Sequence, residues 1–427
     1  MANTGISRIV IEDALKEIYH PLANEVYNNN VTLTQHVLTK SQGLKESEVN
    51  GKSVNITIST RRASSFSAPS ENGNIARATQ KNYFKVSTEL KQFTAASAIS
   101  DLSDVIAKDA KKAVSSDKIR DAWAEAAEGA AAGKEALSWS DETAAIATIT
   151  TVTGTNPFVL AIDDQAFFDA ERVAIGQYVQ IDADVASVSA SEFYIVTDIN
   201  FTAQTVTVSR SVGSGTPVNG DLLFPEDSAG NGLNGIKGAI DNSASASTEF
   251  QGIAPNNSRT EGKWKANLID AQNAELGYRL LDDALHDTAL HANIKLTKDI
   301  RHGKTDQYLL IANRRALAKS YEEQEDQIRY GAGNLNMGGD NYNTVTLPSG
   351  YTLKEVVGVP DGCVYGIHVP SVYNMQAPGG LHNPDGKLFY RFEKKTYKEV
   401  FLMDFSNYIW EARNTHLKIS NLDVDPA

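Results

Sequence analysis

The sequence predicts an α+β fold in which a small all-β domain interrupts a larger body of helices and strands. Two alternating patterns within residues 50–100 indicate a long β-hairpin, and helical patterns recur in both halves of the chain. Between them, residues 143–224 are rich in β-branched side chains arranged in short alternating runs. A chain of 427 residues, 41% apolar and 22% charged, is long enough for two or three domains.

The first 49 residues predict an N-terminal arm of short elements. Apolar side chains from Ile11 to Val26 follow helical spacing, and Pro21 interrupts that run. We therefore expect two short helical pieces with a break near His20, followed by a short strand over Val31–Val37.

The hairpin is predicted from two period-2 strands, Gly51–Thr60 and Tyr83–Phe93. Phe84, Val86 and Thr88 fall on one face of the second strand. Residues 61–82 are small and polar and read as a loop. Ten paired residues would give an arm on the order of 30–40 Å long. Because an isolated hairpin is marginally stable in water, we expect this arm to lie on another surface.

The charge of the arm differs in sign from the charge of the chain. Residues 60–92 carry a net charge of +4 in a chain of net charge −13, so the remainder carries −17. A basic arm on an acidic body favours docking on another copy of the same chain, while a solvated surface hairpin is the alternative. The basic residues of the arm are Arg61, Arg62, Arg77, Lys81, Lys85 and Lys91.

Helical patterns follow the hairpin. Ser100 or Asp101 can cap a helix over Leu102–Val114, and residues 115–117 can cap a second helix over Lys118–Leu137. The second helix carries a stripe of small residues, which allows another backbone to pack closely against it.

The β-branched region predicts a small barrel or sandwich inserted into the host. Its alternating runs recur every 12–18 residues with turn residues between them, and linkers at 138–141 and 228–235 bound it. The runs are residues 146–152, 158–162, 176–181, 193–199 and 205–209.

The second half mixes helices and strands. We expect its longest helix within Lys263–Asn293, a buried strand over Asp306–Ala312, and a helix over Arg314–Glu325. Residues 330–342 are rich in glycine and asparagine and predict a loop. Further strands are expected at residues 351–357, 364–369, 388–392, 399–404 and 408–413.

The search for chemistry gives no positive sign of an enzyme, a cofactor or a metal site. Residues 230–235 match G-x-G-x-x-G, but no strand feeds them and no helix is evident after them, so the dinucleotide interpretation fails. The single cysteine, Cys363, is expected to be buried and inert. His286 and His291 are five residues apart and read as surface residues of a helix. No membrane span or export signal is visible, and the acidic balance argues against a face that grips nucleic acid.

The order of these parts, together with three short phrases, carries a resemblance. Residues 51–56 (GKSVNI), 231–236 (NGLNGI) and 250–253 (FQGI) followed by Trp264 are individually weak signals. Their order along the chain, together with the arm, the long helix and the late glycine-rich loop, carries more weight. By this order the chain resembles the major capsid protein of tailed bacteriophages, with the Hong Kong 97-like fold. The resemblance covers residues 1–422, with 143–224 as a family-variable insertion.

The resemblance implies a structural virion protein that assembles with itself into the pentamers and hexamers of an icosahedral head enclosing double-stranded DNA. Portal, scaffolding and possibly decoration proteins would be its partners, without sequence-specific DNA binding. It also implies loop residues at the symmetry axes, for which the candidates are Tyr330, Gly331, Gly333, Gly338 and Gly339. The implied parts are an N-terminal arm (1–49), an extended loop (50–100), a peripheral domain with its spine helix (101–142 and 226–298), the insertion (143–225), an axial domain (299–385) and returning strands (386–427).

Two departures from the family pattern bear on assembly. Only about 45 residues precede the hairpin, so a scaffold is expected to be a separate protein. Some members form lysine–asparagine crosslinks, and Lys81 and Lys85 lie in the arm, but lysines are common there and crosslinking is not expected.

Three other functions compete with the capsid interpretation. An encapsulin-like nanocompartment enclosing enzyme cargo is the alternative, which the large β-insertion disfavours. An enzyme with a β-domain lid rests only on the rejected glycine motif. A tail tube or adhesin would show β-patterns throughout, whereas this chain has long helices in both halves.

Overall fold

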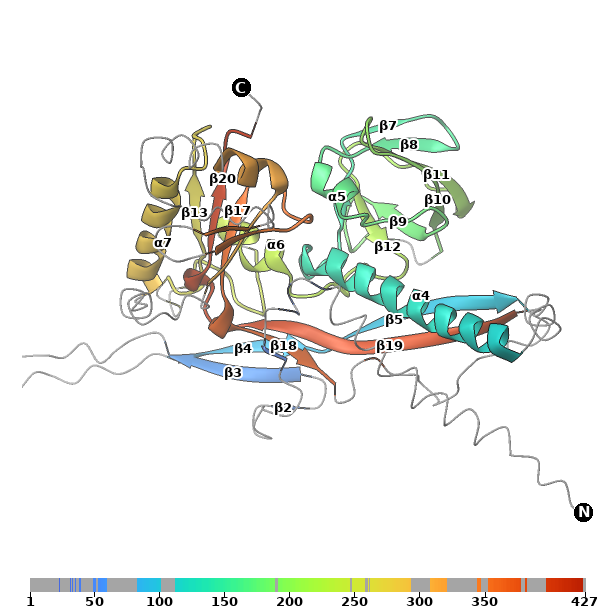
Figure 1. The fold of residues 1–427 in the computed structure, drawn as a ribbon, viewed down its shortest axis with the longest axis horizontal. Coiled ribbons are helices and arrows are strands. Elements are labelled where there is room, and N and C mark those ends of the chain that lie inside the picture. The colour runs from blue at the N-terminus through green and yellow to red at the C-terminus, as the bar shows by residue number, and fades with distance from the viewer. Residues whose placement is uncertain are drawn as a thin grey trace, which may run out of the picture.

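The computed structural model describes residues 83–100, 112–188, 191–245, 248–257, 262–292, 308–320, 352–377 and 397–424, together with short pieces at 23, 31, 33, 35, 38–39, 49–50, 53–59, 260, 344–346 and 381. The predicted mixture of helices and strands is confirmed. Figure 1 shows a long base of strands with one helix along it, and two rounded units above that base.

The arm forms a three-stranded sheet in the order β2-β3-β4. Its strands are β2 (Val49–Asn50), β3 (Ser53–Ser59) and β4 (Tyr83–Glu89), and β3 pairs antiparallel with β4 over seven residues. Phe84, Val86 and Thr88 are buried and alternate with exposed neighbours, as the period-2 pattern predicts. The predicted strand Tyr83–Phe93 is too long, because the chain changes partner at Leu90.

The base is a four-stranded sheet in the order β1-β18-β19-β5. The structure joins the two strands expected at 399–404 and 408–413 into one strand of 14 residues, which ends at Trp410 and not at Arg413. The error arose because the polar pair Ser406–Asn407 interrupts the apolar pattern, yet both side chains are buried within the strand. The strands are β1 (Leu38–Thr39), β5 (Lys91–Ser100), β18 (Val372–Gln376) and β19 (Tyr397–Trp410).

Helix α4 (Lys112–Ser138) lies along this base (Figure 1). The predicted cap at residues 115–117 is wrong, because α4 continues through them, and Gly129 and Gly133 lie inside it. Its small side chains face β19, where Ala127 and Ala131 share a core with Val400 and Leu402. The small-residue stripe therefore lets a long helix approach a long strand closely.

The first rounded unit is a curved seven-stranded sheet built from residues 147–225, in the order β6-β12-β9-β10-β11-β8-β7 (Figure 1). Each predicted β-run overlaps at least one of its strands, whereas helix α5 (Gln165–Asp169) and strand β12 (Leu222–Pro225) were not predicted. The remaining strands are β6 (Ala147–Thr148), β7 (Thr151–Thr153), β8 (Phe158–Ala161), β9 (Tyr178–Asp182), β10 (Phe193–Asn200) and β11 (Thr205–Val212).

The second rounded unit is a six-stranded sheet in the order β13-β20-β17-β14-β16-β15. Helix α7 (Tyr278–Ala292) packs on it through Leu281 and Leu285, which share a core with Leu310 and Ile419. The strands are β13 (Asn267–Asp270), β14 (Tyr308–Ala312), β15 (Thr344–Thr346), β16 (Thr352–Glu355), β17 (Val364–His368) and β20 (Leu417–Ser420).

Short elements complete the described chain. A helix, α6 (Ile236–Ala239), does follow the glycine motif, contrary to our expectation, but it has only four residues. The glycine motif allows close packing here, because a Cβ on Gly235 would overlap the carbonyl oxygens at the end of α4. Three single 3-10 turns are η2 (Asp241–Ala244), η5 (Val369–Ser371) and η6 (Arg413–Thr415).

Four predictions fall partly or wholly outside the described residues. The helix predicted over 314–325 is helical from 314 to 320, and the rest lies outside the described residues. The strand at 388–392 lies outside them, and of the helical pieces around Pro21 only Ala23 is described, which is helical. The strand predicted over 31–37 is wrong at the two positions described as helical, Leu33 and Gln35.

Candidate functional site

No catalytic or metal-binding group emerges from the described residues. Among them, no cluster of three or more His, Cys, Asp or Glu side chains could hold a metal ion. No helix in that part of the chain is both long and apolar enough to cross a membrane. Cys363 is buried, as predicted, and burial raises the pKa of its thiol, which makes it a poor nucleophile. The features that stand out instead join the arm, the base and α4.

The foot of the arm is anchored in its own chain. The ring of Phe84 meets Trp264 edge-on with centroids 5.5 Å apart. Trp264 is fully buried, and its indole Nε1 donates to the carbonyl oxygens of Phe250 and Ile253 at 3.2 and 3.1 Å. This contact holds the described part of the hairpin in place without a neighbour.

Two asparagines tie the arm to β19 and to the glycine-rich segment. Asn407 Nδ2 donates to the Glu89 carbonyl at 2.6 Å, and Asn407 Oδ1 accepts from the Asn234 amide at 2.9 Å. Asn234 Nδ2 in turn donates to Thr88 Oγ1 and to the Tyr408 carbonyl. These bonds satisfy buried amides, so the junction of arm and base is fixed by hydrogen bonding as well as packing.

A buried ion pair joins α4 to β19. Lys134 Nζ lies 3.2 Å from Asp404 Oδ2, and neither side chain is exposed. Asp404 also accepts from Gln376 Nε2 at 3.0 Å and from the hydroxyl of Ser406. Burial lowers the pKa of Lys134, and the Asp404 carboxylate opposes that shift. The pair therefore fixes the position of the helix along the strand.

Arg413 fixes the segment after the glycine motif to the end of β19. Its guanidinium is buried between Phe250 and Trp264, and it donates to the carbonyl oxygens of Ala239 and Gly238 at 2.6 and 2.8 Å. Burial lowers its pKa to about 10, partly offset by Glu142. The guanidinium remains charged at neutral pH and acts as a structural cation.

His416 is a buried, neutral histidine beside Trp410. Its Nδ1 accepts from the His368 amide at 3.1 Å, and its Nε2 lies 3.3 Å from Ser371 Oγ. Burial lowers its pKa well below the usual value, and His368 and Arg413 add to that shift. Because the amide bond requires an unprotonated Nδ1, only the neutral ring fits this site.

We therefore expect acid to destabilise the protein through His416. Below about pH 6.5 the histidine binds a proton in the unfolded chain and stays neutral in the folded chain. The free energy of unfolding therefore falls, by up to about 1.4 kcal/mol per pH unit. The contribution is fully present above pH 6.5 and is lost as the pH falls toward the lowered folded pKa. Urea unfolding of His416→Gln should show a shallower pH slope than wild type, while the control His291→Gln, at an exposed position, should not.

The wild-type protein provides a second check that does not depend on how the variant folds. The imidazole C–H signals of His416 should stay at their neutral positions in NMR spectra from pH 7.5 to 5.5. A midpoint near the ordinary histidine value would contradict the assignment.

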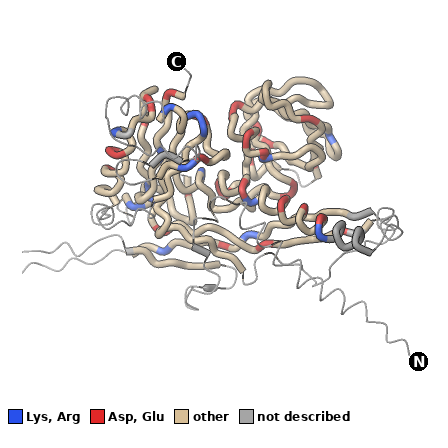
Figure 2. The backbone as a smooth tube through the Cα atoms, in the orientation of Figure 1, with Lys and Arg blue, Asp and Glu red and all other residues tan. Residues whose placement is uncertain are grey.

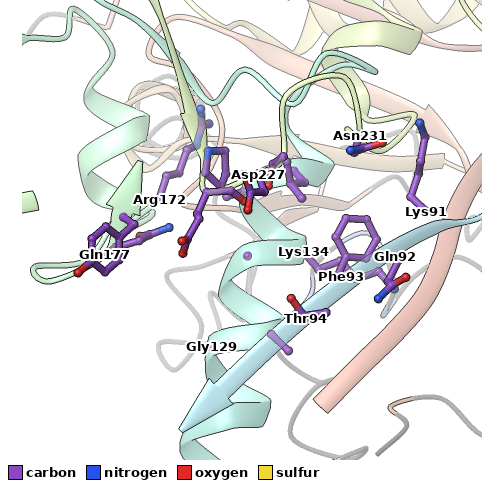
Figure 3. Close-up of a pocket in the computed structure, with 18 of the residues that line it drawn as sticks. Lys91, Gln92, Phe93, Thr94, Gly129, Lys134, Arg172, Gln177, Asp227 and Asn231 are labelled. Carbon is purple, nitrogen blue, oxygen red and sulfur yellow. The ribbon is translucent and has the colours of Figure 1, made fainter. Parts of the chain in front are cut away.

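A cleft of about 710 Å³ lies beside the junction of β4 and β5 (Figure 3). The Glu89–Thr94 stretch forms one wall, and Gly129 and Gly133 of α4 form another. Residues 225–228 and Asn231 close the side nearest the seven-stranded unit. Its lining mixes both signs of charge, so it has no strong electrostatic preference for an anion or a cation.

The structure places two of the predicted arm residues. Lys85 is exposed on β4, and Lys91 Nζ donates to the Gly230 carbonyl at 3.3 Å across the cleft. Lys91 is therefore bonded within its own chain. The other predicted site residues lie outside the described residues: Arg61, Arg62, Arg77 and Lys81 of the arm, and Tyr330, Gly331, Gly333, Gly338 and Gly339 of the axial-loop candidate.

Sequence reasoning missed Lys134, Asp404 and Arg413. Two of them carried a signal, because Lys134 continues the small-residue stripe of α4 and Asp404 interrupts an apolar strand. A charge on an otherwise buried face indicates a buried partner. Figure 2 shows that elsewhere acidic and basic residues are interspersed over the described backbone.

Comparison with known proteins rests on structure alone. No family model and no curated sequence matches the chain. A chain of the Cyanophage A-1(L) capsid asymmetric unit aligns over 95% of this chain and 93% of its own length, with a TM-score of 0.50 and 10% identity. The protein has a phage capsid fold.

Two further solved structures are similar to this chain with lower TM-scores. A chain of the bacteriophage PhiM1 mature capsid covers 93% of this protein and 88% of itself, with a TM-score of 0.41 and 10% identity. The SrpI encapsulin of Synechococcus elongatus covers 38% of this protein and 54% of itself, with a TM-score of 0.26 and 14% identity. Neither score is high enough to carry an argument about this protein.

Proposed function

We propose that this capsid-fold protein is the major capsid protein of a tailed bacteriophage, a non-enzymatic subunit that builds an icosahedral head of pentamers and hexamers around double-stranded DNA. The observation that carries the proposal is the likeness to the cyanophage capsid chain, which extends over almost the whole of both chains. A shell also needs a subunit with several unlike edges that close by symmetry, and an elongated base with an arm suits that need.

The Hong Kong 97-like division of the chain is part of this proposal. Residues 50–100 would be the extended loop, α4 the spine helix, residues 143–225 the insertion, 299–385 the axial domain and 386–427 the returning strands. The arm cations would contact neighbouring subunits, and residues 330–339 would lie near the symmetry axes. The partners would be further copies of the chain, a portal, a separate scaffolding protein and possibly a decoration protein.

Particle size tests the proposal. The purified chain, alone and co-expressed with the neighbouring genes of its genome, should give closed shells, or rings of five and six that close on adding scaffold, in electron micrographs and sedimentation. Shells loaded with protein and lacking DNA when recovered from the native host would favour the encapsulin-like alternative. A stable monomer or dimer under every condition would refute both.

A further inference from the structure

The seven-stranded unit is connected to the rest of the chain by two linkers that lie side by side. The chain enters through residues 141–146 and leaves through 226–232, and the amides of Gly230 and Gly232 donate to the carbonyl oxygens of Thr143 and Glu142 at 2.9 and 3.1 Å. The first and last strands of the unit, β6 and β12, also pair with each other. Two covalent connections at one place form a hinge, and a hinge alone does not fix an orientation.

Arg172 makes a contact away from that hinge. It follows α5 in the seven-stranded unit, and its Nη2 donates to the carbonyl oxygen of Gly358 at 3.1 Å, in the turn between β16 and β17 of the six-stranded unit. Its Nη1 lies within reach of the Ile146 carbonyl at 3.3 Å and of Asp164 Oδ2 at 3.5 Å. The Arg172 side chain is only 7% exposed.

The partners of Arg172 are themselves held in place. Asp164 caps α5 by accepting from the Ala166 amide at 3.1 Å. On the other side, Gly358 abuts the indole of Trp139, and a Cβ at this position would overlap that ring. Trp139 Nε1 donates to Glu135 Oε1 at 2.9 Å, which ties the contact to the end of α4.

Open space surrounds this contact. Arg172 lines the 710 Å³ cleft (Figure 3) and also a second cleft of about 370 Å³ between the two rounded units. A third cleft, of about 460 Å³, separates Asp169–Glu171 from Lys354–Gly358. An apolar cluster that includes Trp139 and Val359 passes through the junction between these clefts. The clefts leave open space on either side of the Arg172 contact, and this shared apolar cluster is the packing that a turn of the unit would have to shift.

We propose that Arg172 is a latch that sets the orientation of the seven-stranded unit, and that releasing it lets the unit turn about the paired linkers as a rigid body. This inference concerns the single subunit and does not depend on the proposed capsid function. Loss of the guanidinium removes the donors to Gly358 and leaves Asp164 without its cation, while the sheet of the unit keeps its own core.

The orientation can be measured between two spin labels on a cysteine-free background. Cys363→Ala removes the one native thiol, and Asp198→Cys on β10 and Asp287→Cys on α7 place labels at exposed positions in the two rounded units. Labelled chain is diluted into unlabelled chain, so that distances between copies do not contribute. We expect one narrow distribution of label-to-label distances for the labelled chain that keeps Arg172.

Arg172→Met keeps the bulk of the side chain and removes its donors. We expect its distance distribution to be at least about twofold broader, or to be displaced. The matched control is Arg210→Met, because Arg210 donates to Gly215 and stacks over Phe158 inside the same unit. The control should retain the narrow distribution.

A second variant changes the residue that accepts the hydrogen bond from Arg172. Gly358→Ala leaves every charge in place but pushes the β16–β17 turn against Trp139, so it should broaden the distribution as Arg172→Met does. Unchanged narrow distributions in both folded variants would overturn the proposal. Should Arg172→Met fail to fold, Gly358→Ala alone decides it.

Discussion

Replacing Lys134 with methionine is expected to lower the free energy of unfolding by about 3–5 kcal/mol. The substitution keeps the helix propensity and most of the volume of the side chain, but it removes the cation that lies 3.2 Å from the buried Asp404 carboxylate. Gln376 and Ser406 still donate to that carboxylate, and they do not supply the missing charge. Guanidinium unfolding followed by circular dichroism measures the change.

The matched control lies on the same helix. Arg120 is 3.7 Å from Asp121, and the two side chains are 56% and 62% exposed, so Arg120→Met should change the free energy of unfolding by no more than about 1 kcal/mol. Adding Asp404→Leu to Lys134→Met should recover part of the loss, because an apolar pair replaces the ion pair. A cost below 1 kcal/mol for Lys134→Met alone would show that the pair is not energetically coupled to folding.

Deleting residues 62–81 is expected to abolish closure of the proposed shell while leaving the subunit folded. The foot of the arm is anchored in its own chain by Phe84 on Trp264. Ser59 and Tyr83 are paired, so Thr60, Arg61 and Asn82 would remain as a three-residue hairpin loop. Contacts with a neighbour that the removed segment makes would be lost, while the packing of Phe84 on Trp264 would remain.

Sedimentation and electron microscopy measure closure, and circular dichroism confirms the fold. A variant of full length with glutamine at Arg61, Arg62, Arg77 and Lys81 separates the charge of the segment from its length. If charge drives docking, this variant should close only at low efficiency and with little dependence on salt. Closed shells of normal size from the deletion would refute the assignment of the arm as an intersubunit element.

The elements that could be predicted from sequence are those whose pattern follows from their own side chains. The strands of the arm alternate because one face is buried, and the buried faces of Val54 and Phe84 are the ones the period-2 pattern selects. The same holds for the runs at 158–162 and 205–209, which overlap β8 and β11. Burial of alternate residues is a local property, so it is visible before the fold is known.

The errors occurred where a distant partner compensates a polar residue. The polarity of Asn407 suggested a break in the strand that is β19. Asn407 can be buried because its Nδ2 donates to the Glu89 carbonyl and its Oδ1 accepts from the Asn234 amide. The polar residues of the candidate site were missed for the same reason, because their partners are distant in the sequence. Lys134 and Asp404 are 270 residues apart, and Arg413 donates to carbonyl groups 174 and 175 residues away. A charge on an apolar face can mark one partner, but periodicity does not show which distant residue is the other.

The α+β class, the hairpin, most of the strands and the burial of the one cysteine were predictable, because these depend on residue type and short-range periodicity. Three features became visible only in the folded chain: β5 leaves the hairpin to pair with β19, a buried ion pair holds α4 to the base, and Arg172 crosses between two sheets. The physical reason is that a buried charge or amide is stable only beside its partner, and chain topology alone determines which distant residue that partner is.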